Sequence, residues 1–171
     1  REECHIAGCH LLDPSSGEYN LSYVKQYMPD TPAKIISLVE RQQGLIVAKG
    51  NPKNILPITD LARSDIRFIN RQRGAGTRVF FDYQLGINGM TSDDVSGYTR
   101  EQYTHLTVAA AVASGTSDVG LGIHAATIAL DLDFIPLATE NYDLIIPNTH
   151  YDTELIRSLL EKRCHVQIFV S

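Results

Sequence analysis

Cysteine is scarce in this chain of 171 residues, which contains only Cys4, Cys9 and Cys164. An odd number of cysteines without CxxC spacing argues against a disulfide framework and against a structural zinc site. Cys4 and Cys9 are each followed by a histidine, but an alternating strand would point the two cysteines to opposite faces. We therefore expect reduced thiols and no metal site.

Long hydrophobic runs are also missing. No apolar run reaches the roughly 18 residues of a membrane-spanning helix, and residues 1–5 do not resemble a signal peptide. We therefore expect no membrane span and a cytoplasmic location, or a periplasmic one if an upstream signal segment is missing from this chain. The net charge of -5 argues against nonspecific nucleic-acid binding, so no direct nucleic-acid contact is expected.

Catalytic motifs are absent as well, including the GxSxG elbow and the HExxH pair. The carboxylate pairs at residues 93–94 and at Asp131 and Asp133 have no base or nucleophile placed beside them. Ser114 and Ser117 are better explained as helix-end and turn residues than as nucleophiles. These absences favour binding over catalysis, so we predict a non-enzymatic domain without a cofactor.

What the chain does contain is an alternation of strands and helices. Runs that predict strands occupy residues 4–12, 33–40, 44–48, 66–70, 118–123, 133–137, 142–147 and 165–170. Runs that predict helices occupy residues 21–28, 59–62, 77–85, 105–114, 124–130 and 153–163. This alternation predicts an α/β fold, and the length suits one domain or two small lobes.

The stretch at residues 68–78 carries the strongest functional signal. An apolar run ends here, two glycines mark a turn, and a helix follows. The first turn of a helix has unpaired N–H groups and a partial positive charge, which together favour anions. Arg71, Arg73 and Arg78 add guanidinium groups suited to oxyanions. The alternative is a tight turn with solvated arginines, because the stretch has neither a P-loop ending nor a full GxGxxG.

Several segments together resemble the solute-binding-protein-like domain of the type II periplasmic binding protein superfamily. They lie at residues 7–13, 17–20, 43–52, 68–78, 103–105, 108–122 and 132–137, in the order of the family. The similar domains are fused to molybdopterin-biosynthesis proteins or to helix-turn-helix regulators, and tungstate- and molybdate-binding proteins are more distant relatives. The resemblance implies two α/β lobes joined by crossover hinge strands, with a ligand held between the lobes.

The resemblance also implies domain boundaries. Residues 1–47 would form a partial first lobe and a hinge, and residues 48–136 the second α/β lobe with the anion-site candidate. Residues 137–171 would form the return hinge and a C-terminal helix that packs on the first lobe. The family's usual N-terminal βαβα segment is missing here, so the first lobe is expected to be incomplete. Apolar sheet surface near residues 35–39 would then be exposed, and a second copy could cover it in a homodimer.

The candidate ligand-binding residues form two groups. The first group offers backbone N–H groups, a hydroxyl and two guanidinium groups, and comprises Arg73, Gly74, Ala75, Gly76, Thr77 and Arg78. The second group, Thr104 and His105, opens a helix whose N-terminus would face the same ligand if the lobes follow the family. A plain N-cap is the alternative for Thr104, and a surface or hydrogen-bonded histidine is the alternative for His105.

Four further polar residues, His10, Glu18, Tyr19 and Asn20, lie on the side of the first lobe. They could border the ligand site, but we interpret them mainly as turn and packing residues. Asn20 is also the expected N-cap of the helix at residues 21–28.

By resemblance, the predicted function is a non-catalytic sensor or receptor domain for a small oxyanion. Molybdate or tungstate is the first candidate, with a link to molybdenum-cofactor biosynthesis or its regulation. On this prediction, Arg78→Ala weakens ligand binding without unfolding the chain. Two alternatives stay open, namely a domain of a molybdopterin-biosynthesis enzyme and an oligomerisation or interaction module.

Overall fold

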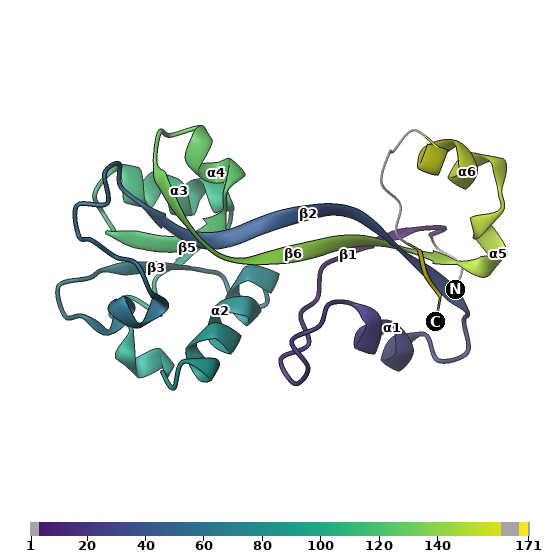
Figure 1. The fold of residues 1–171 in the computed structure, drawn as a ribbon, viewed down its shortest axis with the longest axis horizontal. Helices are drawn as coiled ribbons and strands as arrows, with labels where there is room; N and C mark the ends of the chain where they lie inside the picture. Colours follow the sequence, from purple (N-terminus) through teal and green to yellow (C-terminus); the bar gives the residue numbers. More distant parts are fainter. Residues whose placement is uncertain (1–3, 162–167, 171) are drawn as a thin grey trace. The chain divides into compact units, whose positions relative to one another are not determined.

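The computed structural model describes residues 4–161 and 168–170. The chain forms two compact units, of which unit 1 comprises Arg1–Arg41 with Glu140–Ser171 and unit 2 comprises Gln42–Thr139. Two strands of 15 residues each, β2 (Ala33–Val47) and β6 (Asp133–Pro147), run from one unit into the other (Figure 1). The chain therefore passes between the units twice, within regular strands.

Each of these long strands replaces two shorter strands that the sequence predicts. The runs at residues 33–40 and 44–48 belong largely to β2, and those at 133–137 and 142–147 belong to β6. The prediction of separate strands was wrong because polar residues between the runs do not end a strand when they have partners. Arg41 of β2, for example, forms an ion pair with Glu140 of β6.

Unit 2 is an α/β layer structure in which β3 has parallel neighbours on both sides. The strand order is β2-β5-β3-β4, with β5 antiparallel to β2 and parallel to β3. The strands and helices that complete this unit are β3 (Phe68–Arg71), α2 (Gly76–Ile87), β4 (Glu101–Gln102), α3 (His105–Ala113), β5 (Val119–Ile123) and α4 (Ala125–Ile128). Two 3-10 helices, η1 (Ile58–Ala62) and η2 (Ser92–Asp94), lie in the connections. The crossovers that join β3 to β4 and β4 to β5 place α2 and α3 on opposite faces of the sheet (Figure 1).

The core of unit 2 depends on close approach of α3 to the sheet. Val108 of α3 packs with Ile46 and Ile69 in one buried cluster. A Cβ atom at Gly120 would collide with Val108 and lie 2.8 Å from Cγ2 of Ile69, so glycine is required at this contact. On the other side of the sheet, the rings of Phe68 and Phe81 stack with centroids 4.5 Å apart.

Unit 1 is built on the other halves of β2 and β6. The elements that complete it are β1 (Ala7–Cys9), α1 (Leu21–Tyr27), α5 (Asn148–Tyr151), α6 (Glu154–Glu161) and β7 (Ile168–Val170). Strand β1 pairs antiparallel with β6, and β7 pairs antiparallel with β2. Residues 162–167, which include Cys164, lie outside the described residues. The end of the expected helix at 153–163 and the start of the expected strand at 165–170 fall in this range.

The expected exposure of apolar sheet surface near residues 35–39 is wrong for Ile35 and Ile36 and confirmed only for Val39, which is 45% exposed. Ile35 and Ile36 are only 3% and 1% exposed. Val24 of α1 packs with Ile35 on one face of the sheet, and Ile156 of α6 packs with Ile36 on the other. The homodimer stays a prediction, but this buried surface gives it no support.

Asn20 precedes α1 but does not cap it through its side chain. Its side chain is buried, accepts a hydrogen bond from the backbone N–H of Leu11 at 2.7 Å, and donates to Oδ2 of Asp143 at 2.8 Å. Its φ angle of 65° is one that asparagine tolerates better than most residues. The expected N-cap position is confirmed, but its side chain makes no capping bond because these buried partners use the amide group. Burial also raises the pKa of Asp143.

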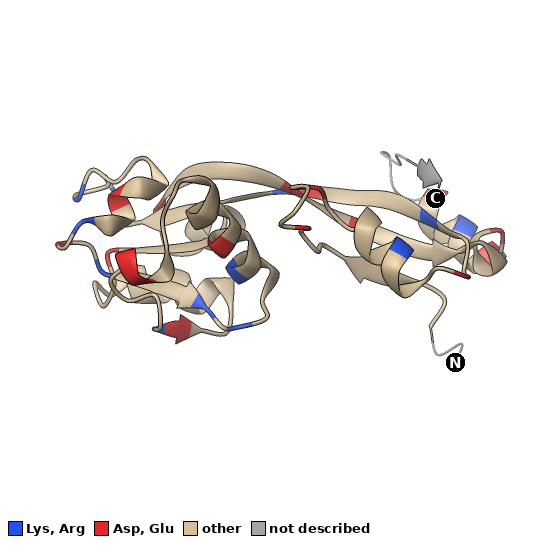
Figure 2. Cartoon of the chain, turned by 90° about the horizontal axis from the view of Figure 1, so that it is seen from below, with Lys and Arg blue, Asp and Glu red and all other residues tan. Residues whose placement is uncertain are grey.

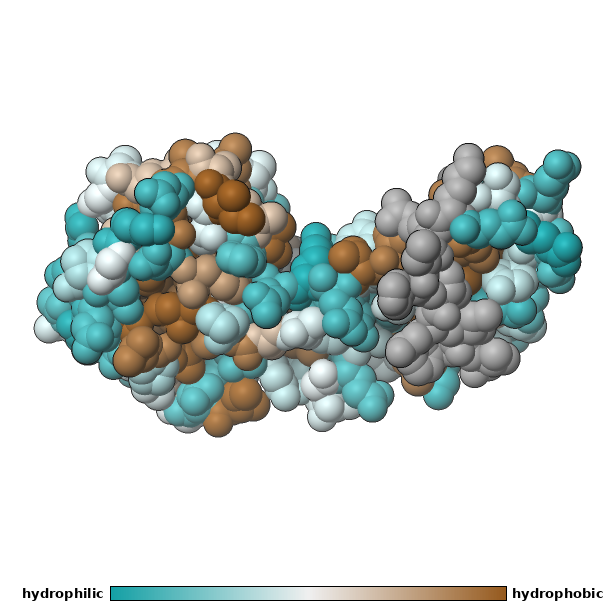
Figure 3. Space-filling model, turned by 45° about the horizontal axis from the view of Figure 1, so that its top comes forward, coloured by the Kyte–Doolittle hydropathy of each residue, from teal (hydrophilic) through white to brown (hydrophobic). Residues whose placement is uncertain are grey.

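Charged and apolar side chains are both distributed over the surface. Lys and Arg are interspersed with Asp and Glu over both units (Figure 2). Apolar side chains reach the surface of unit 2 in several places (Figure 3), and the exposed apolar residues include Leu106 of α3 and Ile128 of α4. Within the described residues, no helix is both long and apolar enough to span a bilayer.

We predict that Gly44→Ala lowers the stability of unit 2 by about 1–3 kcal/mol, as overpacking in a closed site does. A Cβ atom at Gly44 would collide with the carbonyl oxygen of Ile135 and lie 2.8 Å from Cζ of Phe134. Urea unfolding measures the change in the free energy of unfolding. Gly86→Ala in α2 is the control, because a Cβ there meets nothing within 4 Å and should stabilise the helix by about 0.5–1 kcal/mol. Equal effects of the two substitutions would contradict the crowding at Gly44.

Candidate functional site

The predicted ligand-binding residues lie at the carboxyl edge of the sheet in unit 2. Because β3 is parallel to both β4 and β5, the ends of all three strands meet at this edge. The backbone N–H of Gln72 donates to the carbonyl of Gln102 at 3.1 Å, and Nη2 of Arg71 donates to the carbonyl of Tyr103 at 3.0 Å. These bonds join the segments that lead into α2 and α3. The structure thus brings both predicted groups to one edge.

The loop before α2 presents backbone donors. A hydrogen bond of 3.2 Å from the Ala75 N–H to the Gln72 carbonyl closes a β-turn, with Gly74 in a left-handed conformation at its third position. Ala75 is the N-cap residue and has no side-chain group that can cap. In the described part of the chain, the N–H groups of Gly76 and Thr77 have no acceptor. This uncapped helix start can therefore donate to an anion.

The two predicted arginines occupy different environments. Arg73 is 85% exposed at its side chain, with Nε 3.9 Å from Oε1 of Glu101. Arg78 is buried, and its Nη1 donates to the carbonyl of Arg71 at 3.1 Å and to Oε1 of Glu101 at 3.2 Å. Its guanidinium carbon also lies 4.0 Å from the ring centroid of Tyr98. Arg73 is therefore free to reach a ligand, whereas Arg78 holds the loop and β4 together.

The second predicted group starts α3. The hydroxyl of Thr104 accepts a hydrogen bond from the N–H of Thr107 at 3.0 Å, and the hydroxyl of Thr107 accepts from the N–H of Thr104 at 3.1 Å. This reciprocal capping confirms that Thr104 is an N-cap. His105 is half-buried, and its Nδ1 lies 3.4 Å from the place that a Cβ on Gly122 would take. The contact of either residue with a ligand stays a prediction.

Charge beneath the carboxyl edge is mixed. Arg71 is buried, its Nε and Nη2 donate to Gln72 and Tyr103, and burial lowers its pKa. Arg78 faces the carboxylate of Glu101, and its Nε lies 3.5 Å from Oδ1 of Asp82. Two carboxylates, of Glu101 and Asp82, thus offset much of the positive charge of the arginines, so backbone donors contribute a large share of any anion binding.

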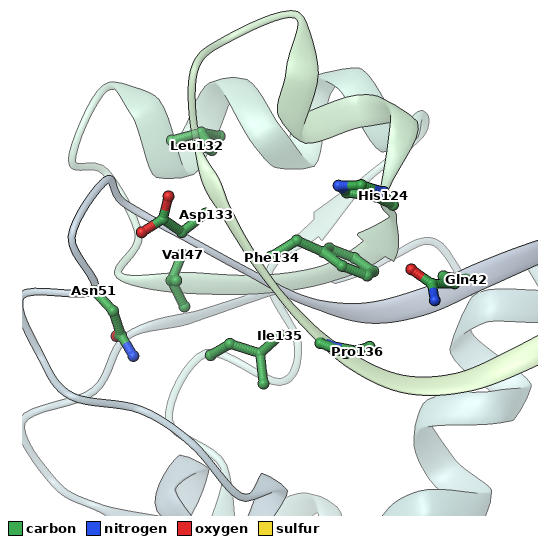
Figure 4. A pocket seen from close by; sticks show the side chains of 9 residues that line it. All are labelled: Gln42, Val47, Asn51, His124, Leu132, Asp133, Phe134, Ile135 and Pro136. Carbon is green, nitrogen blue, oxygen red and sulfur yellow. The ribbon is translucent and has the colours of Figure 1, made fainter.

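A groove in unit 2 escaped the sequence analysis. It has a volume of about 560 Å³ and is lined by Gln42, Val47, Asn51, His124, Leu132, Asp133, Phe134, Ile135 and Pro136 (Figure 4). We call it the β2–β6 groove, since most of its lining comes from these two strands and the residues next to them. The sequence assigned His124 to a helix, but it directly follows the last residue of β5. That position, after a buried parallel strand, is the signal that could have drawn attention to it.

A polar cluster in unit 1 also involves residues that the sequence analysis treated as packing residues. Glu140 is buried and pairs with Arg41, while Nδ1 of His10 lies 3.8 Å from its Oε2. The rings of His10 and Tyr142 stack with centroids 5.3 Å apart. Burial, and then the charge of Glu140, raises the pKa of Tyr19 to about 12. In the part of the chain that is described, no three His, Cys, Asp or Glu residues are grouped as metal ligands.

Comparison with known proteins identifies related sequences and folds. A sequence model of the family described as PBP superfamily domain matches residues 1–162. The chain is 44% identical over 144 residues to the protein YvgK of Bacillus subtilis strain 168. The matched segment covers 84% of this chain and 47% of YvgK. The chain thus spans about half the length of this relative.

Solved structures share the fold at low sequence identity. The regulatory domain of CcmR from Synechocystis PCC6803 in complex with 2-PG superposes with a TM-score of 0.65 at 14% identity, covering 94% of this chain and 72% of that one. A phosphate-bound substrate-binding protein of a putative phosphate ABC transporter from Clostridium perfringens gives a TM-score of 0.59 at 14% identity, covering 92% and 71%. These likenesses confirm the expected α/β fold of the periplasmic-binding-protein type.

The environments of the two arginines predict a large loss of stability for one substitution and almost no change for the other. Arg78→Ala removes two hydrogen bonds of a buried cation and leaves Glu101 without this partner, so it should lower the free energy of unfolding by about 2–3 kcal/mol. The expectation that Arg78→Ala weakens ligand binding without unfolding the chain stays a prediction, because a domain usually has more stability than this loss removes. Arg73→Ala, at an exposed side chain, should change stability by less than about 0.5 kcal/mol. Urea unfolding of both variants measures the difference, and a stable Arg78→Ala protein would refute the structural role.

The raised pKa of Tyr19 predicts a loss of stability in alkali. In the folded chain this phenol has a pKa of about 12, whereas the ordinary pKa of a tyrosine is 10.0. The stabilisation is therefore complete below pH 10.0 and disappears as the pH rises towards 12. Absorbance of tyrosinate during an alkaline titration, compared with that of Tyr19→Phe, isolates this group. If the wild-type chain shows one more tyrosine ionising near pH 10.0 than Tyr19→Phe does, the pKa of Tyr19 is not raised.

Proposed function

Because the chain belongs to the family of PBP superfamily domains, we propose that it is a non-catalytic ligand-binding domain for a small oxyanion. The uncapped start of α2 is the observation that carries this proposal. The unbonded N–H groups of Gly76 and Thr77 follow directly on the turn at residues 72–75. An oxyanion at this position would supply the acceptors that Ala75 cannot supply.

The physical balance at the edge suits a dianion with several oxygens. The dipole of α2 places partial positive charge at its first turn, and Arg73 is exposed at the same turn. Backbone donors are fixed by the turn and the helix, so they lose little freedom when a ligand binds. The proposal needs no metal and no full set of counter-charges, because oriented amides recognise anions by themselves.

Two kinds of oxyanion fit the proposal. The resemblance to the molybdopterin-linked domains makes molybdate or tungstate the first candidate, in a sensor for molybdenum-cofactor biosynthesis or its regulation. Phosphate is the second, because a structural neighbour from Clostridium perfringens contains bound phosphate. All are tetrahedral anions with oxygens that accept N–H bonds, so the same helix start could serve either kind. The domain could also work inside a longer molybdopterin-biosynthesis enzyme, since the relative YvgK is about twice the length matched here.

A thermal-shift series with molybdate, tungstate, sulfate and phosphate tests the proposal. A ligand that binds only the folded chain raises its stability, by about 2.7 kcal/mol at 100 times its dissociation constant. A rise in the unfolding midpoint with molybdate or tungstate but not sulfate would favour the first candidate. No concentration-dependent rise with any of the four anions would overturn the proposal.

Ala75→Asp tests the position of the site. The φ and ψ angles of Ala75, -72° and 137°, suit an N-cap carboxylate, which would occupy the free N–H groups of α2 and repel an anion. We expect the free protein to gain about 1 kcal/mol of stability and the anion-induced rise in midpoint to disappear.

Ala75→Asn is the matched control for charge, because its amide can cap the helix without a negative charge. We expect it to reduce the anion-induced rise less than Ala75→Asp does. A full anion response in Ala75→Asp would show that the start of α2 is not the site.

A further inference from the structure

One end of the β2–β6 groove, lined by His124 and Gln42, lies at the same edge of unit 2 as the proposed oxyanion site. His124 lines the groove and directly follows β5, the strand that pairs with β3 on one side and with β2 on the other (Figure 4). The loop that enters α2 follows β3, so the two features start from adjacent, parallel strand ends. A ligand held at the start of α2 therefore has the His124 end of the groove on the neighbouring strand end.

The backbone of His124 is held by hydrogen bonds, whereas its imidazole ring makes no hydrogen bond within the described residues. Its N–H donates to the carbonyl of Gln42 at 3.2 Å, and its carbonyl accepts from the hydroxyl of Thr127 at 2.8 Å. The imidazole lies against the ring of Phe134, with centroids 4.9 Å apart and planes inclined by 31°. Throughout residues 4–161, no side chain or carbonyl hydrogen-bonds its ring nitrogens. An exposed ring held in this way is free to contact a ligand.

The rest of the groove combines apolar side chains with the amides of Gln42 and Asn51 and, among its described lining residues, holds no further cation. Phe134, Ile135 and Pro136 lie next to one another on β6 and all line it. Asp133 also lines it, but its carboxylate already accepts from the N–H of Gly50 at 2.9 Å and pairs with Lys49. A bare tetrahedral anion is too small to use both the start of α2 and a groove of about 560 Å³.

We infer that the natural ligand is an organic anion, with its oxyanion group at α2 and its carbon part in the β2–β6 groove against His124 and Phe134. This inference rests on the proposed function and narrows its ligand class. It favours an organic phosphate over molybdate, tungstate or free phosphate. The groove then supplies the selectivity that the helix start lacks, because backbone N–H groups can bind any small oxyanion of the right size.

Calorimetric titration with inorganic phosphate and with phenyl phosphate tests the inference, with molybdate and tungstate titrated alongside. Burial of a phenyl ring should tighten binding about tenfold or more relative to inorganic phosphate. His124→Ala should reduce this gain to about threefold or less and leave the affinity for inorganic phosphate within about twofold. His124→Phe keeps the aromatic face and should retain most of the gain.

His5→Ala is the matched control, because His5 is an exposed histidine of unit 1 and does not line the groove. Equal affinities for the two phosphates in the wild-type chain would overturn the inference and leave the proposed oxyanion site standing. A gain that His124→Ala does not reduce would also overturn it, since the carbon part would then bind elsewhere. No binding of phosphate, phenyl phosphate, molybdate or tungstate would overturn the proposed function, and the inference with it.

Discussion

The parallel pairing of β3 with both β4 and β5 is the constraint on which the candidate site depends. Parallel strands need crossover connections, and the two crossovers here return through α2 and α3. Their starts must therefore lie at one edge of the sheet, although residues 76 and 105 are far apart in sequence. The hydrogen bond between Gln72 and Gln102 fixes this arrangement at the point where β3 and β4 end.

The arginines around this edge differ in what they contribute. Arg71 and Arg78 are buried and use their donors on carbonyl and carboxylate groups of the protein itself. A buried cation that loses its partners is costly, so these two residues hold the turn at a fixed distance from β4. Arg73, which is exposed, can move towards an anion without breaking such bonds. The two buried arginines thus mainly stabilise the conformation of the turn, and we expect backbone N–H groups and Arg73 to contact the anion.

The sequence predicted local features well where a short segment contains the whole cause. The N-cap at Thr104 follows from its own hydroxyl and from Thr107 three residues later, and the start of α2 lies within one residue of the prediction. The burial of Arg78 could not be predicted, because Tyr98 and Glu101 approach it only after β4 has paired with β3. The side-chain role of Asn20 was missed for the same reason, since its partner Asp143 is distant in sequence.

Long-range pairing also explains why the strand boundaries and the groove were missed. Polar residues such as Arg41 mark a break in a local pattern, but pairing with Glu140 keeps β2 regular through that point. Gly44 has no side chain, which lets β6 pass close to β2 at Ile135, a residue that lines the β2–β6 groove. A side chain at residue 44 would hold the two strands apart at this point and change the lining at Phe134. This close approach depends on a contact between Gly44 and Ile135, residues distant in sequence, which no periodicity in the sequence reveals.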